Sequence, residues 1–315
     1  MQKNVDVPRG GAAAPDEFFK VERRGMEPVP DAERHGSPLE LAPVWAGAMA
    51  NYVSLLTGAL VIGAPLALGL SQGQLGLIDS AIAIILGAGL AALLHGLVSA
   101  TGARTGTPQM IFARAVFGHR GAYLGAAFTW IMAIGWFAVD CIIGGWALVQ
   151  LAGIFGIPKT TEVAMGSITL VLLLSVGVAI YGHQTVHIFE KYGSMVFLAF
   201  CVLLFVVLLP KVHWNLPTTV HGPSRFAAMV VGGSFIYALV ASWIPFASDY
   251  SRYLPRQVSA RRIAWWAGLG IGLPTAVLGI LGVILSTINP GNPDLLSEIT
   301  AVTPPWLTIP FLLFV

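Results

Sequence analysis

Asp140 is the residue whose position in the sequence is hardest to reconcile with its charge. It lies near the middle of an unbroken apolar run, residues 121–157, whereas the other six acidic residues beyond position 43 lie at the ends of such runs or between them. A carboxylate in the middle of a membrane helix costs at least about 2.5–3.5 kcal/mol on the insertion scale, and it usually marks a substrate or ion path. The alternative is a protonated carboxyl group that joins two helices by a hydrogen bond.

Trp136 precedes Asp140 by four residues, so the two side chains project from one face of a helix. An indole offers a flat surface for stacking, and a carboxylate accepts hydrogen bonds from N–H groups. Together they suit a planar, nitrogen-rich heterocycle. Trp130 and Trp146 in the same run show that a tryptophan here can also serve packing alone.

The elements that must position this pair are membrane spans. Of the 315 residues, 56% are hydrophobic and 10% are charged, whereas about 25% are charged in an ordinary soluble domain. A helical span needs about 20 apolar residues. Windows of that length occur at about 44–70, 78–101, 121–155, 163–182, 192–210, 226–247 and 264–288, and an eighth begins near Thr303. Only about a dozen residues of the eighth window remain before Val315, so we expect either a fragment of a longer gene or a truncated product.

This composition predicts an all-α integral membrane protein and disfavours other classes. A net charge of +2 without a basic stripe gives no sign of a nucleic-acid partner. The chain has no Walker-type, HExxH or nucleophile-elbow motif, and a single buried acid supplies no acid–base pair. We therefore expect neither an enzyme nor a cofactor, and no metal site. The two cysteines lie in apolar windows, so we interpret them as small hydrophobic residues.

The basic residues indicate the orientation in the membrane. With the N-terminus inside, eight lysines and arginines fall in cytoplasmic connections and three in outer connections, as the positive-inside rule requires. We expect a multi-pass protein of the bacterial inner membrane or the plasma membrane with a cytoplasmic N-terminus. Residues 1–43 contain eight acidic residues and little apolar periodicity, which predicts a mobile tail. Residues 44–315 form the expected transmembrane domain, incomplete at the C-terminus.

The first and sixth windows combine helix breakers with small polar residues. The first contains Gly47, Asn51, Ser54, Thr57, Gly58, Gly63 and Pro65, and the sixth contains Gly232, Gly233, Ser242 and Pro245. Discontinuous helices, whose freed backbone groups bind a substrate or a coupling ion, show this pattern. The match between the two windows suggests an inverted repeat of five plus five spans. The alternative is that glycine and proline are simply frequent in membrane helices.

Four stretches carry a more specific signal: ANYVSLLTGALVIGAPLALGLS in the first window, the connection GARTGTPQMIFARAVFGHRG after the second, GWFAVDCIIGGWALVQ in the third, and WIPFASDYSRYLP at the end of the sixth. They resemble the nucleobase cation symporter family, and within it the purine-cytosine permease branch. The resemblance runs from about residue 38 to the end. It implies a leucine-transporter-type fold of two inverted five-span repeats, usually completed by two further spans. The hydroxyl and asparagine residues of the family's eighth span lie beyond the end of this chain.

The resemblance also implies which residues bind the base. Trp136 matches a tryptophan that stacks on the base, and Asp140 matches the polar residue one turn later, where other members carry Gln or Asn. An aspartate there would favour substrates that present N–H donors, or it would add a protonatable coupling group. For the second aromatic residue, one alignment register points to Val240, but we favour Trp243.

Asn51 matches an asparagine in the first span of this branch and is assigned to the substrate or ion cavity. Ser242, beside Trp243, completes the expected substrate site. Asp140, Ser54 and Thr57 are the candidates for ion coupling.

We therefore expect a secondary active transporter that imports a nucleobase, such as cytosine or a purine, or a related heterocycle such as allantoin. Symport with a proton or sodium ion would proceed by alternating access. The alternatives are an uncoupled facilitator, or a truncated sensor or scaffold in the membrane that does not transport. The sequence leaves open the base, the ion and the oligomeric state.

Overall fold

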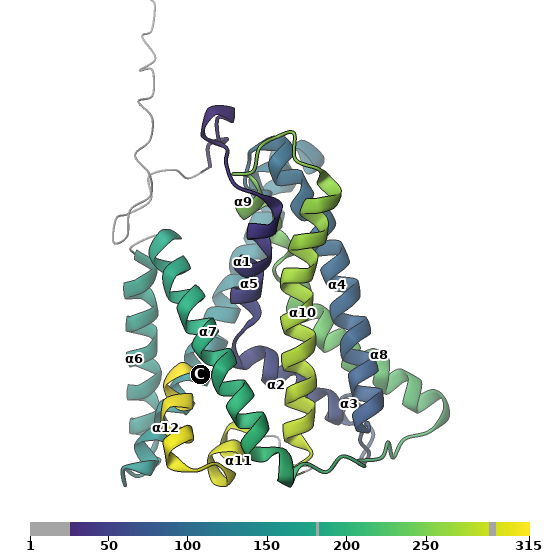
Figure 1. The fold of residues 1–315 in the computed structure, drawn as a ribbon, viewed down its shortest axis with the longest axis vertical. Coiled ribbons are helices and arrows are strands. Elements are labelled where there is room, and N and C mark those ends of the chain that lie inside the picture. Colours follow the sequence, from purple (N-terminus) through teal and green to yellow (C-terminus); the bar gives the residue numbers. More distant parts are fainter. Residues whose placement is uncertain (1–25, 181–182, 290–293) are drawn as a thin grey trace, which may run out of the picture.

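The computed structural model describes residues 26–180, 183–289 and 294–315, which form helices and their connections (Figure 1). The longer helices are α4 (Leu77–Thr105), α5 (Gln109–Ile154), α6 (Thr161–Ile180), α7 (His183–Leu208), α8 (Gly222–Ala241) and α10 (Ala260–Ser286). The shorter α-helices are α1 (Leu41–Met49), α2 (Tyr52–Leu60), α3 (Ala64–Ala67), α9 (Ala247–Ser251), α11 (Leu295–Val302) and α12 (Pro305–Phe314). Short 3₁₀ turns are η1 (Asp31–Glu33), η2 (Pro38–Glu40), η3 (Val61–Gly63), η4 (Leu209–Lys211) and η5 (Ile244–Phe246).

The membrane spans follow the apolar windows of the sequence. Six of the described helices are long and apolar enough to cross a membrane, and a seventh span is made by a bent pair, Pro38–Met49 with Tyr52–Ala67. The prediction of seven spans is thereby confirmed. The helix α12 has 10 residues and occupies the place of the predicted eighth window.

The first and sixth spans are both interrupted, as their composition predicts. The axis of the first span bends by 66° between its two halves. In the sixth span, α8 ends at Ala241, the turn η5 contains Pro245, and α9 follows. The glycines of these windows have a different role from the one expected, because Gly58, Gly232 and Gly233 lie within regular helix. They serve close packing and do not break the helix.

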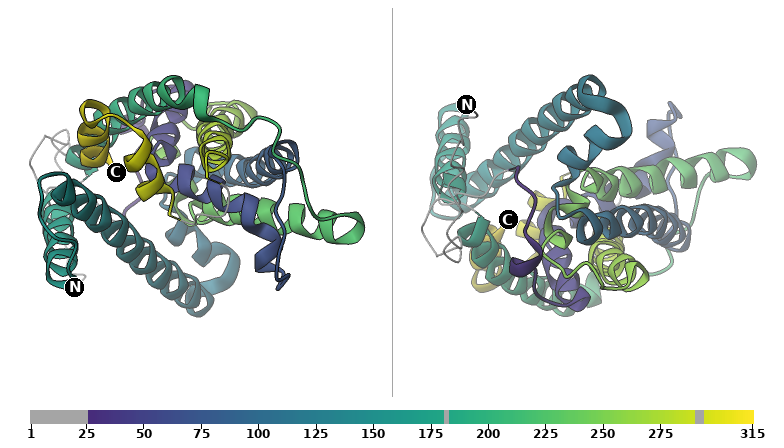
Figure 2. Two further views of the ribbon diagram at one scale, coloured as in Figure 1. Left: turned by 90° about the horizontal axis from the view of Figure 1, so that it is seen from below. Right: turned by 90° about the horizontal axis from the view of Figure 1, so that it is seen from above.

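Backbone contacts through glycine join α2, α4, α8 and α10, which Figures 1 and 2 show gathered together. A Cβ atom added to Gly96 of α4 would lie 2.2 Å from the carbonyl oxygen of Ala264 on α10. A Cβ atom added to Gly87 of α4 would lie 2.2 Å from the carbonyl oxygen of Gly233 on α8. Small residues allow helices to approach closely in a membrane, where association relies on van der Waals packing and interhelical hydrogen bonds.

The Gly282→Ala variant is expected to destabilise the protein. The added Cβ would lie 1.9 Å from the carbonyl oxygen of Leu55, so α2 and α10 would have to separate. Overpacking of this kind typically costs about 1–3 kcal/mol. Thermal unfolding in detergent should show a clear drop in midpoint. The matched control is Gly89→Ala on α4, where no atom lies within 4 Å of the added Cβ. An equal effect of both variants would contradict this explanation.

Residues 102–121, after the second span, were predicted to form a connecting loop, and this prediction is wrong for most of the segment. Most of it is helical, because α5 already begins at Gln109 and runs into the third span. A straight helix of 46 residues would be about 69 Å long, but Gly118 interrupts it with φ 70° and ψ 173°. Only glycine adopts that conformation readily. The first turn is tied to α9, since the Gln109 backbone N–H donates to Asp249 Oδ1 at 2.8 Å.

The expected N-terminal tail is described in part. Residues 1–25 lie outside the described residues. Beyond them, the Val29 N–H donates to the Gly106 carbonyl at 2.9 Å, and the His35 N–H donates to that of Tyr253 at 2.7 Å. The Arg34 guanidinium donates to the Ala103 carbonyl at 2.7 Å. This segment therefore lies against the ends of α4 and α9.

Candidate functional site

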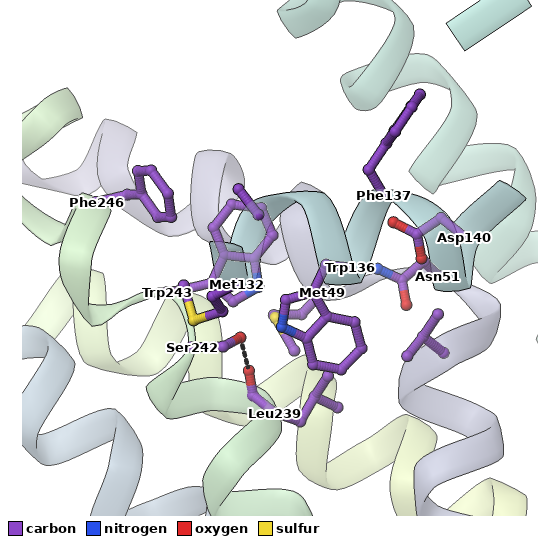
Figure 3. Close-up of a pocket in the computed structure, with 12 residues that line it drawn as sticks. Met49, Asn51, Met132, Trp136, Phe137, Asp140, Leu239, Ser242, Trp243 and Phe246 are labelled. Carbon is purple, nitrogen blue, oxygen red and sulfur yellow. Dashed lines mark hydrogen bonds between the residues drawn. The ribbon is translucent and has the colours of Figure 1, made fainter. Parts of the chain in front are cut away.

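A pocket of about 270 Å³ lies where the two interrupted spans face α5. Its walls come from the α1–α2 break, from the middle of α5 and from the end of α8 with η5 (Figure 3). The lining residues are Met49, Asn51, Val53, Met132, Ala133, Trp136, Phe137, Asp140, Leu239, Ser242, Trp243 and Phe246. Ligand pockets usually measure about 300–1,000 Å³, so this one suits a small molecule.

Asn51 holds the break in the first span. Its backbone is extended, with φ −140° and ψ 170°, and its side-chain oxygen accepts from the Ser54 N–H at 3.1 Å. Its amide group donates to the Ala48 carbonyl at 2.9 Å. The residue therefore caps the N-terminus of α2 and also closes the C-terminus of α1. The ends of two half-helices, with opposite partial charges, meet at the pocket wall.

Trp136 and Asp140 both line the pocket from α5, where they lie one turn apart on one face of the helix. In Figure 3 the Asp140 carboxylate and the Asn51 amide lie toward one end of the pocket, and Ser242 and Trp243 lie toward the other. Among the described residues, no side chain or backbone group donates a hydrogen bond to Asp140 or forms an ion pair with it. The carboxylate is therefore available to a ligand.

The sixth span contributes Ser242 and Trp243 at its break. The Trp243 ring contacts Trp45 and Phe246 edge to face, each at a centroid distance of 6.1 Å. The Ser242 hydroxyl donates to the Leu239 carbonyl at 2.7 Å, which leaves its lone pairs free to accept. Val240, the alternative for the second aromatic position, is fully buried and does not line this pocket.

Ser54 and Thr57 do not line this pocket. The Ser54 hydroxyl is fully buried and donates to the Met49 carbonyl at 2.7 Å. The Thr57 hydroxyl donates to the Val53 carbonyl at 2.7 Å. Both hydroxyls are thus bonded to the backbone of the first span.

Several lining residues were not identified from the sequence. Met132 lies one turn before Trp136, and Phe137 lies beside it, so the helical period that joins Trp136 to Asp140 also includes their neighbours. That signal was present in the sequence. By contrast, Met49 and Phe246 lie beside the two breaks, and no local pattern connects them.

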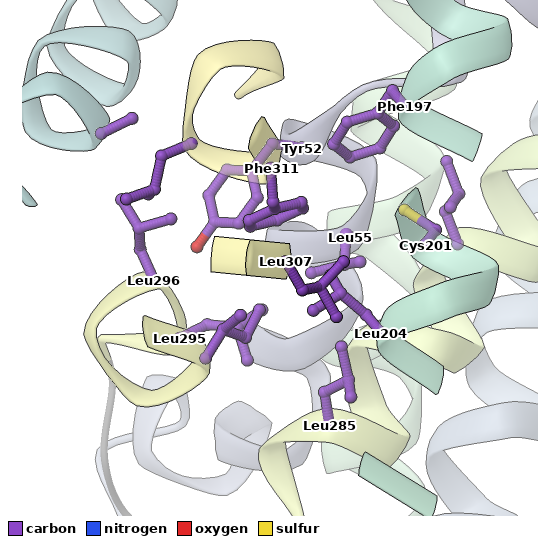
Figure 4. Packing of buried hydrophobic residues seen from close by; sticks show 14 of the residues in the cluster. Tyr52, Leu55, Phe197, Cys201, Leu204, Leu285, Leu295, Leu296, Leu307 and Phe311 are labelled. Atoms are coloured by element: carbon purple, nitrogen blue, oxygen red, sulfur yellow. The ribbon is translucent and has the colours of Figure 1, made fainter. Parts of the chain in front are cut away.

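An apolar cluster lies at the end of the bundle opposite α9 (Figures 1 and 4). In it α12 packs against α2 and α7: the Phe311 ring stacks on Phe197 at a centroid distance of 6.0 Å and contacts Tyr52 at 6.4 Å. Leu295 and Leu296 of α11 belong to the same cluster. The second half of the first span is thus fixed by α7, α11 and α12.

Glu298 on α11 lies outside the spans, and its side chain is nearly inaccessible. Burial raises its pKa to about 7, although the Asn289 backbone opposes the shift. The folded state therefore holds this proton more tightly than the unfolded state. The resulting stabilisation is complete below the ordinary pKa of 4.5 and is lost as the pH rises through about 7.

The melting temperature of the wild type is therefore expected to fall from about pH 5 to about pH 8 more steeply than that of Glu298→Gln. Thermal unfolding in detergent across this range measures both slopes. Glu162→Gln, which removes an exposed acid, should keep the wild-type slope. Parallel curves for the wild type and Glu298→Gln would show that Glu298 does not carry the effect.

Two interrupted spans that meet a third helix at a pocket are characteristic of the leucine-transporter type of fold. A solved structure with this fold is that of Mhp1, described as a nucleobase-cation-symport-1 family transporter in a closed conformation with bromovinylhydantoin bound. It superposes with a TM-score of 0.70 at 18% identity, over 91% of this chain and 63% of Mhp1. The expected fold class is confirmed.

Residues 28–315 match the family model described as permease for cytosine/purines, uracil, thiamine, allantoin. The chain belongs to this family. It is 33% identical over 276 residues to the putative purine-cytosine permease YxlA of Bacillus subtilis, covering 86% of this chain and 56% of that one. It is 27% identical over 271 residues to the purine-cytosine permease fcyB of Emericella nidulans, covering 85% and 50%. The chain thus spans about half the length of these curated relatives.

Proposed function

We propose that this chain forms the substrate-binding part of a secondary transporter that imports a nucleobase or a related heterocycle. The observation that carries the proposal is the meeting of Trp136, Asp140 and Trp243 in one pocket beside the break at Asn51. The residues come from three separate spans, and their chemistry suits a flat ring with N–H donors at its edge. The names of the relatives support the same class of substrate.

In this mechanism the base stacks on Trp136, and Trp243 covers its other face. Asp140 accepts hydrogen bonds from the ring edge, and Asn51 and Ser242 supply further polar contacts at the two breaks. Cytosine and purines fit this arrangement, as does a non-aromatic heterocycle such as allantoin. Stronger binding in one of the two access states would shift the population between them, as alternating access requires.

Symport with a proton or a sodium ion would drive accumulation. Asp140 is the candidate for proton coupling because its carboxylate has no partner among the described residues. Ser54 and Thr57 remain candidates for ion coupling. Each hydroxyl donates to a first-span carbonyl. Its oxygen lone pairs therefore stay free, and a sodium ion bound near the break would need such oxygen ligands.

We further propose a cell-membrane location, in a bacterial inner membrane or a plasma membrane, with the N-terminus in the cytoplasm. Residues 1–43 then form a cytoplasmic segment, and residues 44–315 belong to the transmembrane domain. The distribution of lysine and arginine between the connections supports this orientation.

Uptake by cells that lack their own base permeases tests the proposal. The longest product of the gene, translated past Val315 if the frame continues, is given radiolabelled cytosine, adenine, guanine or allantoin. We expect one of them to accumulate against its gradient and to require a proton or sodium gradient. Uptake without accumulation would identify a facilitator, and binding without flux would identify a sensor. Either result would overturn the symport proposal.

A further inference from the structure

A second concave region lies on the outside of the bundle, between α4 and α10. The helices touch through their backbones at Gly96 and Ala264. Toward the end of α4 they leave a groove of about 470 Å³. None of its lining residues belongs to the pocket between the broken spans, so the two are separate sites.

The groove is apolar along most of its length. Its floor consists of small residues, among them Ala100 and Ala260. Its walls are Leu93, Leu97 and Trp265, which are 59%, 55% and 62% exposed. Because these large apolar side chains are exposed on two spans, the groove is open along its length in the part of the chain that the structure describes. An elongated apolar group could lie along the floor, parallel to the helices.

The end of the groove carries positive charge. Arg104, in the last turn of α4, and Arg261, near the start of α10, both line it. Among the described residues, neither arginine forms an ion pair or donates a hydrogen bond. By contrast, two other arginines, Arg34 and Arg256, each form an ion pair with Asp31. Arg104 and Arg261 are thus left to an anion from outside the described chain.

We infer that this groove binds an anionic phospholipid. The guanidinium groups would hold the phosphate, whose oxygens they match in pairs. The acyl chain would lie along the alanine floor, and Trp265, in the second turn of α10, would lie near the interfacial level that tryptophan favours in membranes. Basic pockets between spans bind anionic headgroups on the cytoplasmic side. The inference is independent of which base the protein carries.

Lipid exchange followed by native mass spectrometry tests this site. The purified full-length protein is equilibrated with equal amounts of phosphatidylglycerol and phosphatidylcholine in detergent, and the retained lipids are counted. We expect preferential retention of phosphatidylglycerol. Arg104→Gln and Arg261→Gln should each lower this preference about fivefold, since one basic residue near the surface contributes about that factor. The matched control is Arg262→Gln, an exposed arginine that does not line the groove.

A second variant tests the apolar half. Ala260→Leu fills the floor without changing the charge, so it should reduce retention of both lipids. Glycerol phosphate, which carries the headgroup charge without a chain, should compete only weakly. The inference is wrong if the wild type shows no preference, as would follow if another segment of the full-length chain covers the groove. It is also wrong if Arg262→Gln acts like Arg261→Gln. Strong competition by glycerol phosphate with no effect of Ala260→Leu would indicate a site for free phosphate instead.

Discussion

On the proposed symport function, replacing Asp140 with asparagine is expected to weaken substrate binding and to reduce the pH dependence of uptake. The carboxylate lines the pocket and has no partner among the described residues, so a ligand N–H would be its hydrogen-bond donor. A hydrogen bond to a charged group contributes about 2 kcal/mol, or about 30-fold in affinity. Asparagine keeps the shape but cannot exchange a proton. Initial uptake rates across pH and substrate concentration separate the two effects.

The control for this substitution is Glu162→Gln, which neutralises an exposed acid at the start of α6. It should leave both affinity and pH dependence at wild-type values. If Asp140→Asn binds normally but loses its pH dependence, the residue couples protons without contacting the base. If both properties are unchanged, Asp140 has neither role.

Replacing Trp136 with alanine is expected to have the second large effect. Stacking of a base on an aromatic side chain contributes about 1–3 kcal/mol, which corresponds to about fivefold to 150-fold in affinity. Trp136→Phe should keep much of that affinity because it retains a flat ring. Binding by the purified protein, measured by calorimetry or by competition with a labelled base, gives these values directly.

Trp130→Ala provides the matched control for Trp136→Ala. Trp130 lies on the same helix, but its side chain is 66% exposed and does not line the pocket. Its removal should leave affinity unchanged. A similar loss from both variants would mean that the effect reflects the integrity of α5 and not contact with the base. Normal binding by Trp136→Ala would exclude the stacking role.

The sequence was most informative where a local pattern determines the structure. Apolar length located the spans, and breakers near Asn51 and Pro245 indicated which spans are interrupted. The four-residue spacing of Trp136 and Asp140 placed both on one helix face. These features depend on a few neighbouring residues, so they can be deduced without knowledge of the rest of the fold.

The errors arose where distant segments determine the outcome. Gly58 and Gly233 looked like helix breakers, but the backbones of other helices occupy the space beside them. Likewise, the predicted connection after the second span is largely helical, and its start at Gln109 is held by Asp249, 140 residues away. A pattern within one segment contains no information about such partners. The same reason explains why Met49 and Phe246 were missed at the pocket.

The glycine contacts also limit how this molecule can move. Side chains that interlock can change rotamer and let helices slide, but touching backbones have no rotamers to change. Because Gly282 contacts Leu55, Gly87 contacts Gly233 and Gly96 contacts Ala264, we expect α2, α4, α8 and α10 to move together as one body. Closely packed interfaces of this kind shift between discrete arrangements and do not deform continuously. Movement of these four helices relative to α5 would then change the shape of the pocket, because Val53 and Leu239 line it on one side and Trp136 and Asp140 line it on the other.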